Sequence, residues 1–583
     1  MCSHAPPQSI LLPGAKKKRG EGIPRIKAGE TGRPKAHSKF GPLNLYELFE
    51  QAAAKYGPLP CMGKRRVGSD GKLGEFEYIN YDSVLTQLRT VGSGLRSLGL
   101  SPGSTVGIWA SNRIEWMLSS LGAFSQAITN VPLYDTLGEE AIIYEINHAE
   151  LTLIVLEKAK LNVLAPLLGR CPTLKTVVQI EPLAGAVPPA EFEKANVAVT
   201  DWANLTKAGL AYPMPPTLPS PESNAFIMYT SGTTGNPKGV MLSHRNLVFN
   251  NMNCIHTFNY WQGMRWLHAC PMFHIAGGIA IFGVTQVAGT HVIIPAYAPD
   301  LAAETIQERK ITDTLLVPTM VNMLVNMPGV ENYDLSSVQA MAYGASPMPE
   351  AVIRRAMEII PDCAFYHAYG QTEAAPLVAA CPPECHVFEG PNANMYRAAG
   401  LPAVGVEVRV VDDEDNELPR GEVGEIIVRG PNIMLGYWQQ PELTAEALRG
   451  GWMHSGDGGY MDDRGFVFIV DRMKDMVISG GENIYSAEVE DALYQHAAVV
   501  ECAVIGIPDD RWGEAVHAVV RLQDGADTSA EELIAHSHTL IAGFKCPRGI
   551  TFVEEPLPLS GAGKILKTEL RKPYWEGMEK QVN

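Results

Sequence analysis

The chain has 583 residues, of which 46% are hydrophobic and 19% are charged, and its net charge at pH 7 is −17. This length exceeds one ordinary domain and supplies enough apolar material for a large core without disulfide staples. The negative charge argues against non-specific nucleic-acid binding as the main function, so we expect no nucleic-acid partner.

Residues 1–40 form a basic extension rich in proline and glycine, with the run "AKKKRG". This composition is typical of a solvated, disordered segment; a nuclear address, a transit peptide and a contact with a membrane surface are the alternatives. The ten cysteines have no disulfide-type spacing, as expected of reduced thiols in a cytoplasmic protein. No apolar run reaches the ~18–20 residues of a membrane span, so peripheral membrane contact and an organellar location are the alternatives to the cytoplasm.

Helix and strand patterns alternate after this extension. The stretch 84–98 carries apolar residues at helical spacing, and Ser83 is the expected cap and Gly99 the expected end of the helix. A strand pattern at 105–110 is followed by another helical pattern at 113–124. This alternation is typical of βαβ units and predicts a largely parallel sheet.

Further strand patterns end in small or polar residues. They are 224–229, 312–319, 338–346 and 363–370. In open α/β sheets ligands bind beyond the carboxyl ends of the strands, so we expect these ends to converge on one crevice. From about residue 400 short alternating strands predict a small β subdomain, and after Asp471 a final unit mixes helix and strand.

The stretch "YTSGTTGNPKGV", from Tyr229 to Val240, is a glycine-rich polar segment directly after an apolar strand pattern. Its backbone N–H groups can form an anion site, and its hydroxyls and Lys238 add donors and positive charge. Pro237 follows Gly232 where a P-loop would need its Gly-Lys pair, so this is not the usual nucleotide-binding P-loop. We predict a loop that cradles phosphates; a flexible surface loop is the alternative.

This segment resembles the signature loop of the adenylate-forming superfamily, which includes acyl-CoA synthetases, adenylation domains of peptide synthetases and beetle luciferases. The resemblance extends from roughly residue 43 to 572, and four more motifs follow in the family's order. They are "YGQTE" with Tyr369 and Glu373, "HSGDGGY" with Asp457, "DRMKDMVISGGENIY" with Arg472 and Lys474, and "LPLSGAGKILK" with Lys564.

The resemblance implies a two-step reaction that uses ATP, Mg²⁺ and CoA. A carboxylate attacks the α-phosphate of ATP and gives acyl-AMP and pyrophosphate, and a thiol then takes the acyl group from AMP. Because the first step brings two anions together, the site must present positive charge and dipoles to the transferring phosphate.

The resemblance also implies the residues that bind the nucleotide. The β- and γ-phosphates would be held by Thr230, Ser231, Gly232, Thr233, Thr234, Gly235 and Lys238. Thr230 and Glu373 would be the ligands of Mg²⁺, and Thr372 would contact the α-phosphate. The adenine would lie between the ring of Tyr369, next to Gly370, and the backbone of Gly344, Ala345 and Ser346, with His367 at its edge. Asp457 would accept from the ribose hydroxyls, and Arg472 would donate to the same sugar or to phosphate.

Lys564 would stabilise charge on the carboxylate and the α-phosphate during adenylation. The family rotates its C-terminal domain between the two steps, and Lys474 matches the hinge of that rotation. The rotation would bring Gly480, Gly481 and Glu482 against the thiol tunnel. The expected fold is therefore α/β, with a large N-terminal domain of layered αβ subdomains and a small β subdomain at 41–473. A small mobile α+β domain follows at 474–583.

His274 matches a family histidine at the mouth of the acyl pocket, and a buried core histidine is the alternative. The expected lining, Met272–Gly278, Met320, Gly344–Ser346 and Leu377, is apolar or small. We therefore expect a medium- or long-chain fatty acid and a fatty acid–CoA ligase, acting as a monomer or homodimer. The alternatives are an aromatic acid of the cinnamate or benzoate type, the thiol of a separate acyl-carrier protein, and a pseudoenzyme that binds nucleotide or acyl groups.

Overall fold

The structure is a computed structural model. It describes residues 44–67, 73–135, 137–183, 189–230, 236–346, 348–473, 475–509, 511–523, 525–559 and 565–576. The basic extension expected at 1–40 lies outside these residues.

The first large sheet has eight strands in the order β19-β9-β8-β4-β3-β5-β6-β7. Their bounds are β3 (Thr105–Trp109), β4 (Thr129–Pro132), β5 (Leu153–Leu156), β6 (Thr176–Gln179), β7 (Ala198–Asp201), β8 (Asn224–Thr230), β9 (Lys238–Ser243) and β19 (Gly436–Tyr437). The strands from β8 through β7 pair in parallel, whereas β9 runs antiparallel to both β8 and β19. The helices α4 (Glu139–His148), α5 (Lys158–Leu164), α6 (Ala190–Lys194) and α7 (Trp202–Ala211) accompany these strands.

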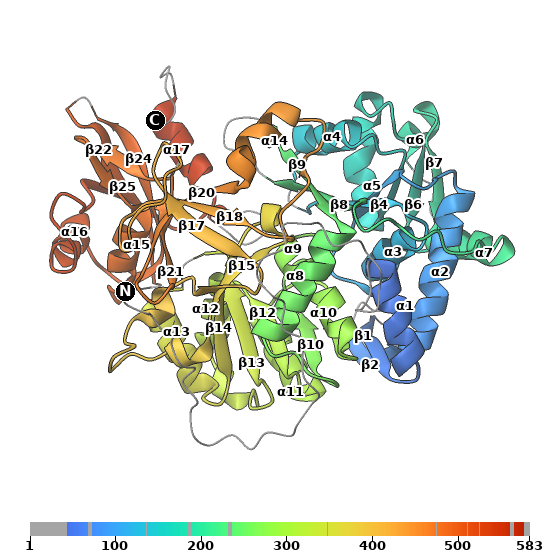
Figure 1. Cartoon of the computed structure of the whole chain (residues 1–583), viewed down its shortest axis with the longest axis horizontal. Coiled ribbons are helices and arrows are strands. Elements are labelled where there is room, and N and C mark those ends of the chain that lie inside the picture. Colours follow the sequence, from blue (N-terminus) through green and yellow to red (C-terminus); the bar gives the residue numbers. More distant parts are fainter. Residues whose placement is uncertain are drawn as a thin grey trace, which may run out of the picture. The chain divides into compact units, whose positions relative to one another are not determined.

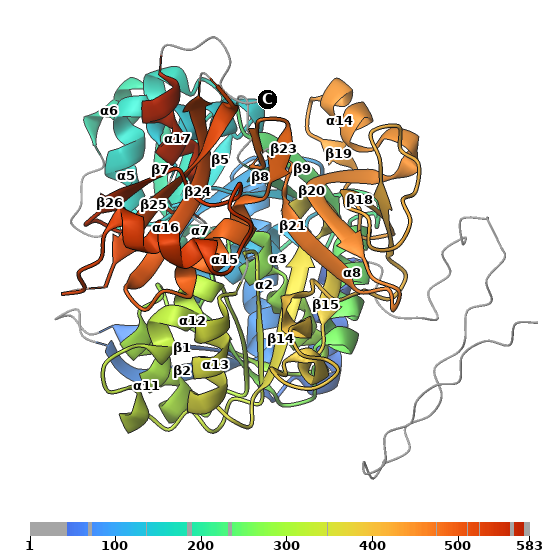
Figure 2. The same ribbon diagram turned by 90° about the vertical axis from the view of Figure 1, so that its left-hand side faces the viewer.

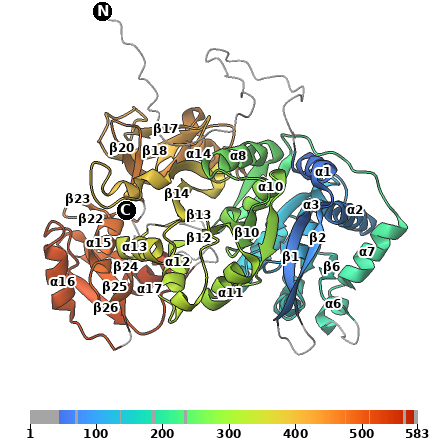
Figure 3. The ribbon, with the colours of Figure 1, turned by 90° about the horizontal axis from the view of Figure 1, so that it is seen from below.

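The second large sheet has nine strands in the order β16-β15-β14-β13-β12-β10-β11-β1-β2. Their bounds are β1 (Pro60–Val67), β2 (Leu73–Asn80), β10 (Arg265–His268), β11 (Thr290–Ile293), β12 (Asp313–Leu316), β13 (Ala340–Gly344), β14 (Ala364–Gly370), β15 (Leu377–Cys381) and β16 (Leu401–Pro402). Figure 3 shows β14, β13, β12 and β10 next to one another. The helices α11 (Pro299–Arg309), α12 (Pro318–Val325) and α13 (Glu350–Ile359) pack together and share a buried apolar cluster with strands of this sheet.

A layer of helices lies between the two large sheets (Figure 1). It contains α1 (Leu45–Tyr56), α2 (Tyr81–Ser97), α3 (Ile114–Phe124), α8 (His244–Thr257) and α10 (Ala280–Gln286). Of these, α8 contacts β9 of the first sheet and β15 of the second. The apolar residues of this layer and of adjoining strands form the largest buried cluster of the described chain, which includes Trp116 and Phe124 from helices and Trp266 from β10. Burying such side chains is the main stabilising contribution to a core of this kind.

A smaller antiparallel sheet of four strands follows in the order β17-β18-β20-β21, and Figure 2 shows β18, β20 and β21 next to one another. The bounds are β17 (Glu407–Val411), β18 (Gly424–Arg429), β20 (Met453–Met461) and β21 (Val467–Arg472), with α14 (Pro441–Ala447) nearby in sequence. The small β subdomain expected after residue 400 is therefore confirmed.

The C-terminal part has its own sheet, in which β23, β22, β25 and β24 are neighbours and β26 pairs with β25. Its elements are β22 (Val477–Ser479), β23 (Glu482–Ile484), α15 (Ser486–Tyr494), β24 (Val499–Asp509), β25 (Gly513–Leu522), α16 (Ala530–His538), β26 (Gly549–Val553) and α17 (Lys567–Trp575). It also has a buried cluster of its own, which includes Val489 and Leu493. The buried carboxylate of Asp471, in β21, accepts a hydrogen bond of 2.7 Å from the Ser486 hydroxyl at the start of α15. The predicted α/β class, with a large N-terminal and a small C-terminal domain, is confirmed.

Three local predictions from the sequence need correction. The cap of α2 is Asn80 rather than Ser83, because the helix already includes the buried Tyr81. The Asn80 side chain accepts a hydrogen bond of 2.9 Å from the Ser83 N–H. The strand patterns belong to two large sheets rather than one, since β8 lies in the first sheet and β12, β13 and β14 lie in the second. The glycine-rich segment is also not loop throughout, because Lys238 to Val240 form the start of β9.

Within the part of the chain that the structure describes, no helix combines the length and the apolar character needed to cross a bilayer.

Candidate active site

The carboxyl ends of β13 and β14 lie side by side, with Gly344 opposite Ala368 in the parallel register. A Cβ at Gly344 would lie 2.0 Å from the Ala368 carbonyl oxygen, so only glycine fits there. Ala345 follows in the left-handed region with a φ of 73°, which is strained for a residue that has a side chain. The two strand ends therefore approach closely at Gly344 and Ala368, the residue before Tyr369.

Tyr369, Asp457 and Arg472 come together although they lie on three different strands. The Tyr369 hydroxyl donates a hydrogen bond of 2.7 Å to Oδ2 of Asp457. Asp457 stands opposite Arg472 in the pairing of β20 with β21, and the Arg472 Nε lies 3.8 Å from Oδ1 of Asp457. Burial, reinforced by the charge of Asp457, raises the pKa of the Tyr369 phenol, so it remains a hydrogen-bond donor.

A second cluster joins Glu373 to the stem of the glycine-rich loop. Glu373 lies in the 3₁₀ helix η3 (Thr372–Ala374) after β14, and its Oε1 accepts a hydrogen bond of 3.1 Å from the Tyr437 hydroxyl. The Lys238 ammonium lies 5.1 Å from the centre of the Tyr437 ring. Thr230 stands opposite Lys238 where β8 pairs with β9.

Burial raises the pKa of Glu373, whereas the Tyr437 hydrogen bond and the charges of Lys238 and Arg472 act in the opposite direction. A half-buried carboxylate in this environment is stabilised further by a cation. With the Thr230 hydroxyl it supplies the hard oxygen donors that Mg²⁺ prefers. These residues therefore fit the ion that the sequence implies.

His367, on β14, has a defined protonation state. Its Nδ1 lies 2.8 Å from the Ala398 carbonyl oxygen, which can only accept, so Nδ1 carries the proton. Burial lowers the pKa of His367 to about 4. At neutral pH its Nε2 is therefore a hydrogen-bond acceptor, and its ring stacks on that of Tyr343 with centroids 5.1 Å apart.

His274 precedes the short helix α9 (Ile275–Gly278), and its Nδ1 accepts a hydrogen bond of 3.3 Å from the Ala276 N–H. Its ring centroid lies 6.2 Å from that of Tyr134. Burial raises the pKa of Tyr134, and the charges of Glu145 and Glu373 raise it further. The Tyr134 ring therefore lies near His274, and its phenol is within electrostatic range of Glu373.

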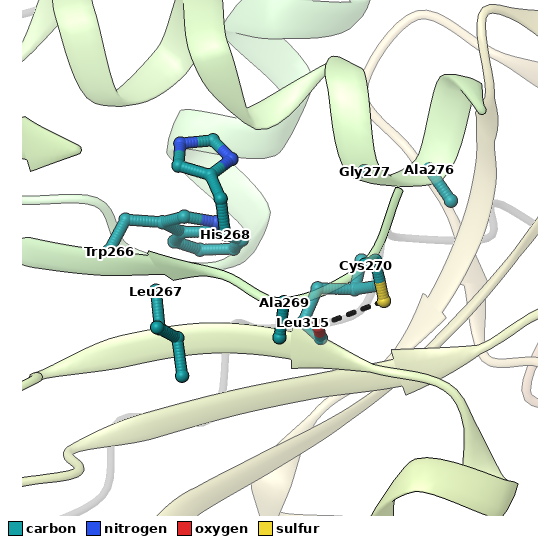
Figure 4. A pocket seen from close by; sticks show the side chains of 8 residues that line it. All are labelled: Trp266, Leu267, His268, Ala269, Cys270, Ala276, Gly277 and Leu315. Carbon is teal, nitrogen blue, oxygen red and sulfur yellow. Dashed lines mark hydrogen bonds between the residues drawn. The ribbon is translucent and has the colours of Figure 1, made fainter. Parts of the chain in front are cut away.

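A narrow crevice lies between the end of β10 and α9 (Figure 4). It is too narrow throughout to admit a water molecule. Ala276 and Gly277, which the sequence places in the acyl pocket, line it together with His268 and Leu315. The lining among the described residues includes no Lys, Arg, Asp or Glu.

The turn at Gly480 and Gly481 connects β22 and β23, and both glycines have positive φ angles, 64° and 85°. A Cβ at Gly480 would lie 2.6 Å from the ring of Trp512. Glu482 begins β23 and is exposed. The hydrogen bonds and ion pairs described for this turn connect it to the C-terminal sheet, and none of them joins it to Tyr369 or Glu373.

Several predicted site residues lie outside the described part of the chain. They are Ser231, Gly232, Thr233, Thr234, Gly235, Lys474 and Lys564. The remaining predicted residues of the nucleotide site are described: Gly370 ends β14, Thr372 begins η3, and Ser346 is half-buried after β13.

No sequence motif indicated Tyr437, Tyr134 or His268. Tyr437 belongs to a strand of two residues, and neither spacing nor composition connects it with Glu373. Tyr134 follows a strand without any motif of its own. His268 could have been noticed, since it is a polar residue within the apolar run just before "PMFH".

The chain is similar to known proteins over most of its length. The model of the AMP-binding enzyme family matches residues 49–438, and that of the AMP-binding enzyme C-terminal domain matches residues 488–564. A feruloyl-CoA synthase of Amycolatopsis sp is 35% identical over 498 residues, which cover 85% of this chain and 94% of that protein. A long-chain-fatty-acid–CoA ligase of Bacillus subtilis (strain 168) is 33% identical over 516 residues, covering 84% and 89% respectively. The ATP-bound structure of MatB from Rhodopseudomonas palustris has a TM-score of 0.77 at 27% identity and covers 92% of this chain and 100% of that chain.

These findings confirm the resemblance based on the five motifs, and with it the prediction of an ATP-dependent, AMP-forming acid–CoA ligase that uses Mg²⁺. The chain belongs to the AMP-binding enzyme family.

Proposed function

We propose that the chain joins a hydrophobic monocarboxylic acid to CoA through an acyl-adenylate. The acid's carboxylate attacks the α-phosphate of ATP, and pyrophosphate leaves. The CoA thiol then attacks the acyl carbon, and AMP leaves. This proposal rests on two side-chain clusters, one at each end of "YGQTE". The first contains Tyr369, Asp457 and Arg472. The second contains Glu373, Tyr437 and Lys238.

The first cluster suits the nucleoside. The bare backbone of Gly344 to Ser346 and the ring of Tyr369 present flat surfaces for adenine. The Nε2 of His367 is an acceptor and matches the exocyclic amino group of adenine. Asp457 accepts from the ribose hydroxyls, and Arg472 donates to the same sugar.

The second cluster suits the phosphates. Lys238 and the segment 231–235 contribute positive charge and N–H donors to the β- and γ-phosphates, and Thr372 contacts the α-phosphate. Thr230 and Glu373 would hold Mg²⁺, which supplies charge neutralisation at the phosphates. Lys564 stabilises the charge that accumulates as the carboxylate approaches.

The second step requires a different arrangement of the C-terminal domain. We place the domain boundary at 473/474 and the hinge at Lys474, so that rotation withdraws Lys564 from the site. Rotation brings Gly480, Gly481 and Glu482 against the thiol. This hinge movement assembles the set of site residues that the second step needs.

The crevice next to α9 suits an apolar acyl group, because its described lining carries no charged side chain. His274 lies beside it, at the mouth that we assign to the acyl pocket. Two classes of acid fit: a medium- or long-chain fatty acid, as expected from the sequence, and an aromatic acid.

The test is ATP–pyrophosphate exchange with a panel of acids, followed by CoA-dependent release of AMP. We expect exchange with at least one hydrophobic acid and its loss in the variant Asp457→Ala. Exchange without CoA-dependent AMP release would contradict CoA as the thiol, and would favour a carrier protein. A chain that binds ATP but shows no exchange with any acid would be a binding protein, and the proposal would fail.

A further inference from the structure

His268, at the end of β10, has a buried ring nitrogen without a hydrogen-bond partner. The residue is 1% exposed. Its Nε2 lies 2.9 Å from Nδ1 of His291, and Nε2 of His291 lies 3.1 Å from the Thr285 hydroxyl. The Thr285 hydroxyl is one end of this series of contacts. At the other end, Nδ1 of His268 has no hydrogen-bond partner.

Both imidazoles are neutral at physiological pH. Burial lowers the pKa of His268 to about 3 and lowers that of His291 further, with the neighbouring ring contributing. Each ring then has one N–H, and the shared contact uses one N–H and one lone pair. Depending on the tautomers, the free Nδ1 of His268 is a donor or an acceptor. Leaving this buried nitrogen unpaired is destabilising.

This nitrogen belongs to a residue that lines the crevice beside α9. Figure 4 shows the His268 ring standing on the side of β10 that faces Ala276 and Gly277. The Cys270 thiol is already used, because it donates to the Leu315 carbonyl oxygen at 3.2 Å. Among the described residues that line the crevice, His268 has the only buried side-chain nitrogen or oxygen without a partner.

Any acyl group must widen the crevice, because it is narrower than a water molecule. Met320 can move aside, because a methionine side chain adapts its shape readily. Its sulfur lies 3.8 Å from that of Cys270. An acyl group that occupies the crevice contacts its lining, which includes His268. A hydrocarbon there would leave Nδ1 unpaired, whereas a hydroxyl can donate or accept and so satisfies either tautomer.

We propose that Nδ1 of His268 hydrogen-bonds an oxygen at the far end of the acyl group, and that the substrate is an oxygen-bearing acid, such as a hydroxylated aromatic acid, rather than an unsubstituted alkyl chain. This inference rests on the proposed function and narrows its substrate. His268 is then the residue that selects the acid, without taking part in the chemistry.

The test compares 4-hydroxycinnamate with cinnamate in CoA-dependent AMP release. We expect the unchanged chain to favour 4-hydroxycinnamate by about tenfold or more in kcat/KM, because a site built to hydrogen-bond a hydroxyl rejects the analogue that lacks it. His268→Phe should remove this preference by lowering kcat/KM for 4-hydroxycinnamate alone. His268→Asn, which keeps a polar atom near the position of Nδ1, should restore part of it.

Thr285→Val is the matched control. It removes the hydroxyl at the far end of the same series of buried contacts and does not change a residue that lines the crevice. It should leave the ratio of the two acids unchanged. Calorimetric binding of the two acids gives a readout that does not depend on turnover, and circular dichroism checks the fold of each variant.

Equal losses for both acids in His268→Phe would mean a structural role and would overturn the inference. The inference would also be overturned if the chain activated decanoate well and activated 4-hydroxycinnamate no better than cinnamate. That result would still support the proposed function. Failure to activate any acid would overturn the proposed function itself, and this inference with it.

Discussion

The Tyr437 hydroxyl lies 3.1 Å from Oε1 of Glu373, and this hydrogen bond crosses from one large sheet to the other. Tyr437 belongs to β19 at the edge of the first sheet, whereas Glu373 follows β14 of the second. The same tyrosine ring lies near Lys238, on the neighbouring strand β9. One aromatic side chain therefore fixes the carboxylate relative to the phosphate-binding loop.

Replacing Tyr437 with Phe keeps the ring near Lys238 but removes the donor to Glu373. Burial already raises the pKa of Glu373, and the lost hydrogen bond had opposed that shift, so the pKa rises further. The carboxylate is the active form, and activity is lost as the pH falls through its pKa. We therefore expect the acid limb of kcat/KM for ATP to move to higher pH, so that the loss of activity is larger at low pH than at pH 8. A pH profile of unchanged shape would contradict this role.

Replacing Tyr369 with Phe leaves the aromatic face for adenine and removes the 2.7 Å hydrogen bond to Asp457. Asp457 then loses the contact that orients it toward the ribose. We expect the KM for ATP to rise about fivefold, equivalent to ~1 kcal/mol, with little change in kcat. Tyr369→Leu should raise it further because it also removes the stacking surface. An unchanged KM in both variants would remove Tyr369 from the nucleotide site.

Gly344 and Ala345 should respond in opposite ways to substitution. Gly344→Ala places a methyl group 2.0 Å from the Ala368 carbonyl oxygen, which forces β13 and β14 apart. We expect a lower melting temperature and loss of the stabilisation by ATP. Ala345→Gly relieves a left-handed conformation that costs roughly 1–2 kcal/mol, so it should leave the melting temperature equal or higher. Thermal melts with and without ATP measure both effects, and a destabilising Ala345→Gly would contradict the strain.

Lys564 and Lys474 lie outside the described residues, so the prediction for them rests on the sequence motifs. Lys564→Ala should reduce pyrophosphate exchange by at least tenfold, while transfer from preformed acyl-AMP to CoA is affected far less. Lys474→Pro should have the reverse effect, because a stiffened hinge blocks the rotation but not adenylation. Equal loss of both half-reactions in either variant would argue against two domain arrangements.

Local sequence patterns predicted individual elements well, because burial periodicity determines them. The helix α3 and the strands β3, β13 and β14 lie where the patterns placed them. The start of α2 was misplaced because Tyr81 was not counted in its apolar face, although it is fully buried. Which strands share a sheet could not be predicted, since pairing depends on contacts between segments far apart in the chain.

The same limit applies to the site. Motifs led to Tyr369, Asp457 and Arg472, and the structure brings these three together. They gave no indication of Tyr437, which is 64 residues from Glu373 and belongs to a minimal strand. His268 was overlooked because a histidine inside an apolar strand is most often a satisfied core residue, and its unpaired nitrogen is visible only in three dimensions.

The contact between Asp471 and Ser486 spans the proposed hinge, since one residue precedes Lys474 and the other follows it. Turning the C-terminal domain about Lys474 must therefore break a charge-assisted hydrogen bond of about 1.5–3 kcal/mol. Breaking this hydrogen bond adds to the activation barrier of the domain rotation. The added barrier does not depend on which acid is bound. The rate of the proposed rotation would then depend on Ser486, although this serine belongs to neither the predicted nucleotide site nor the predicted thiol site.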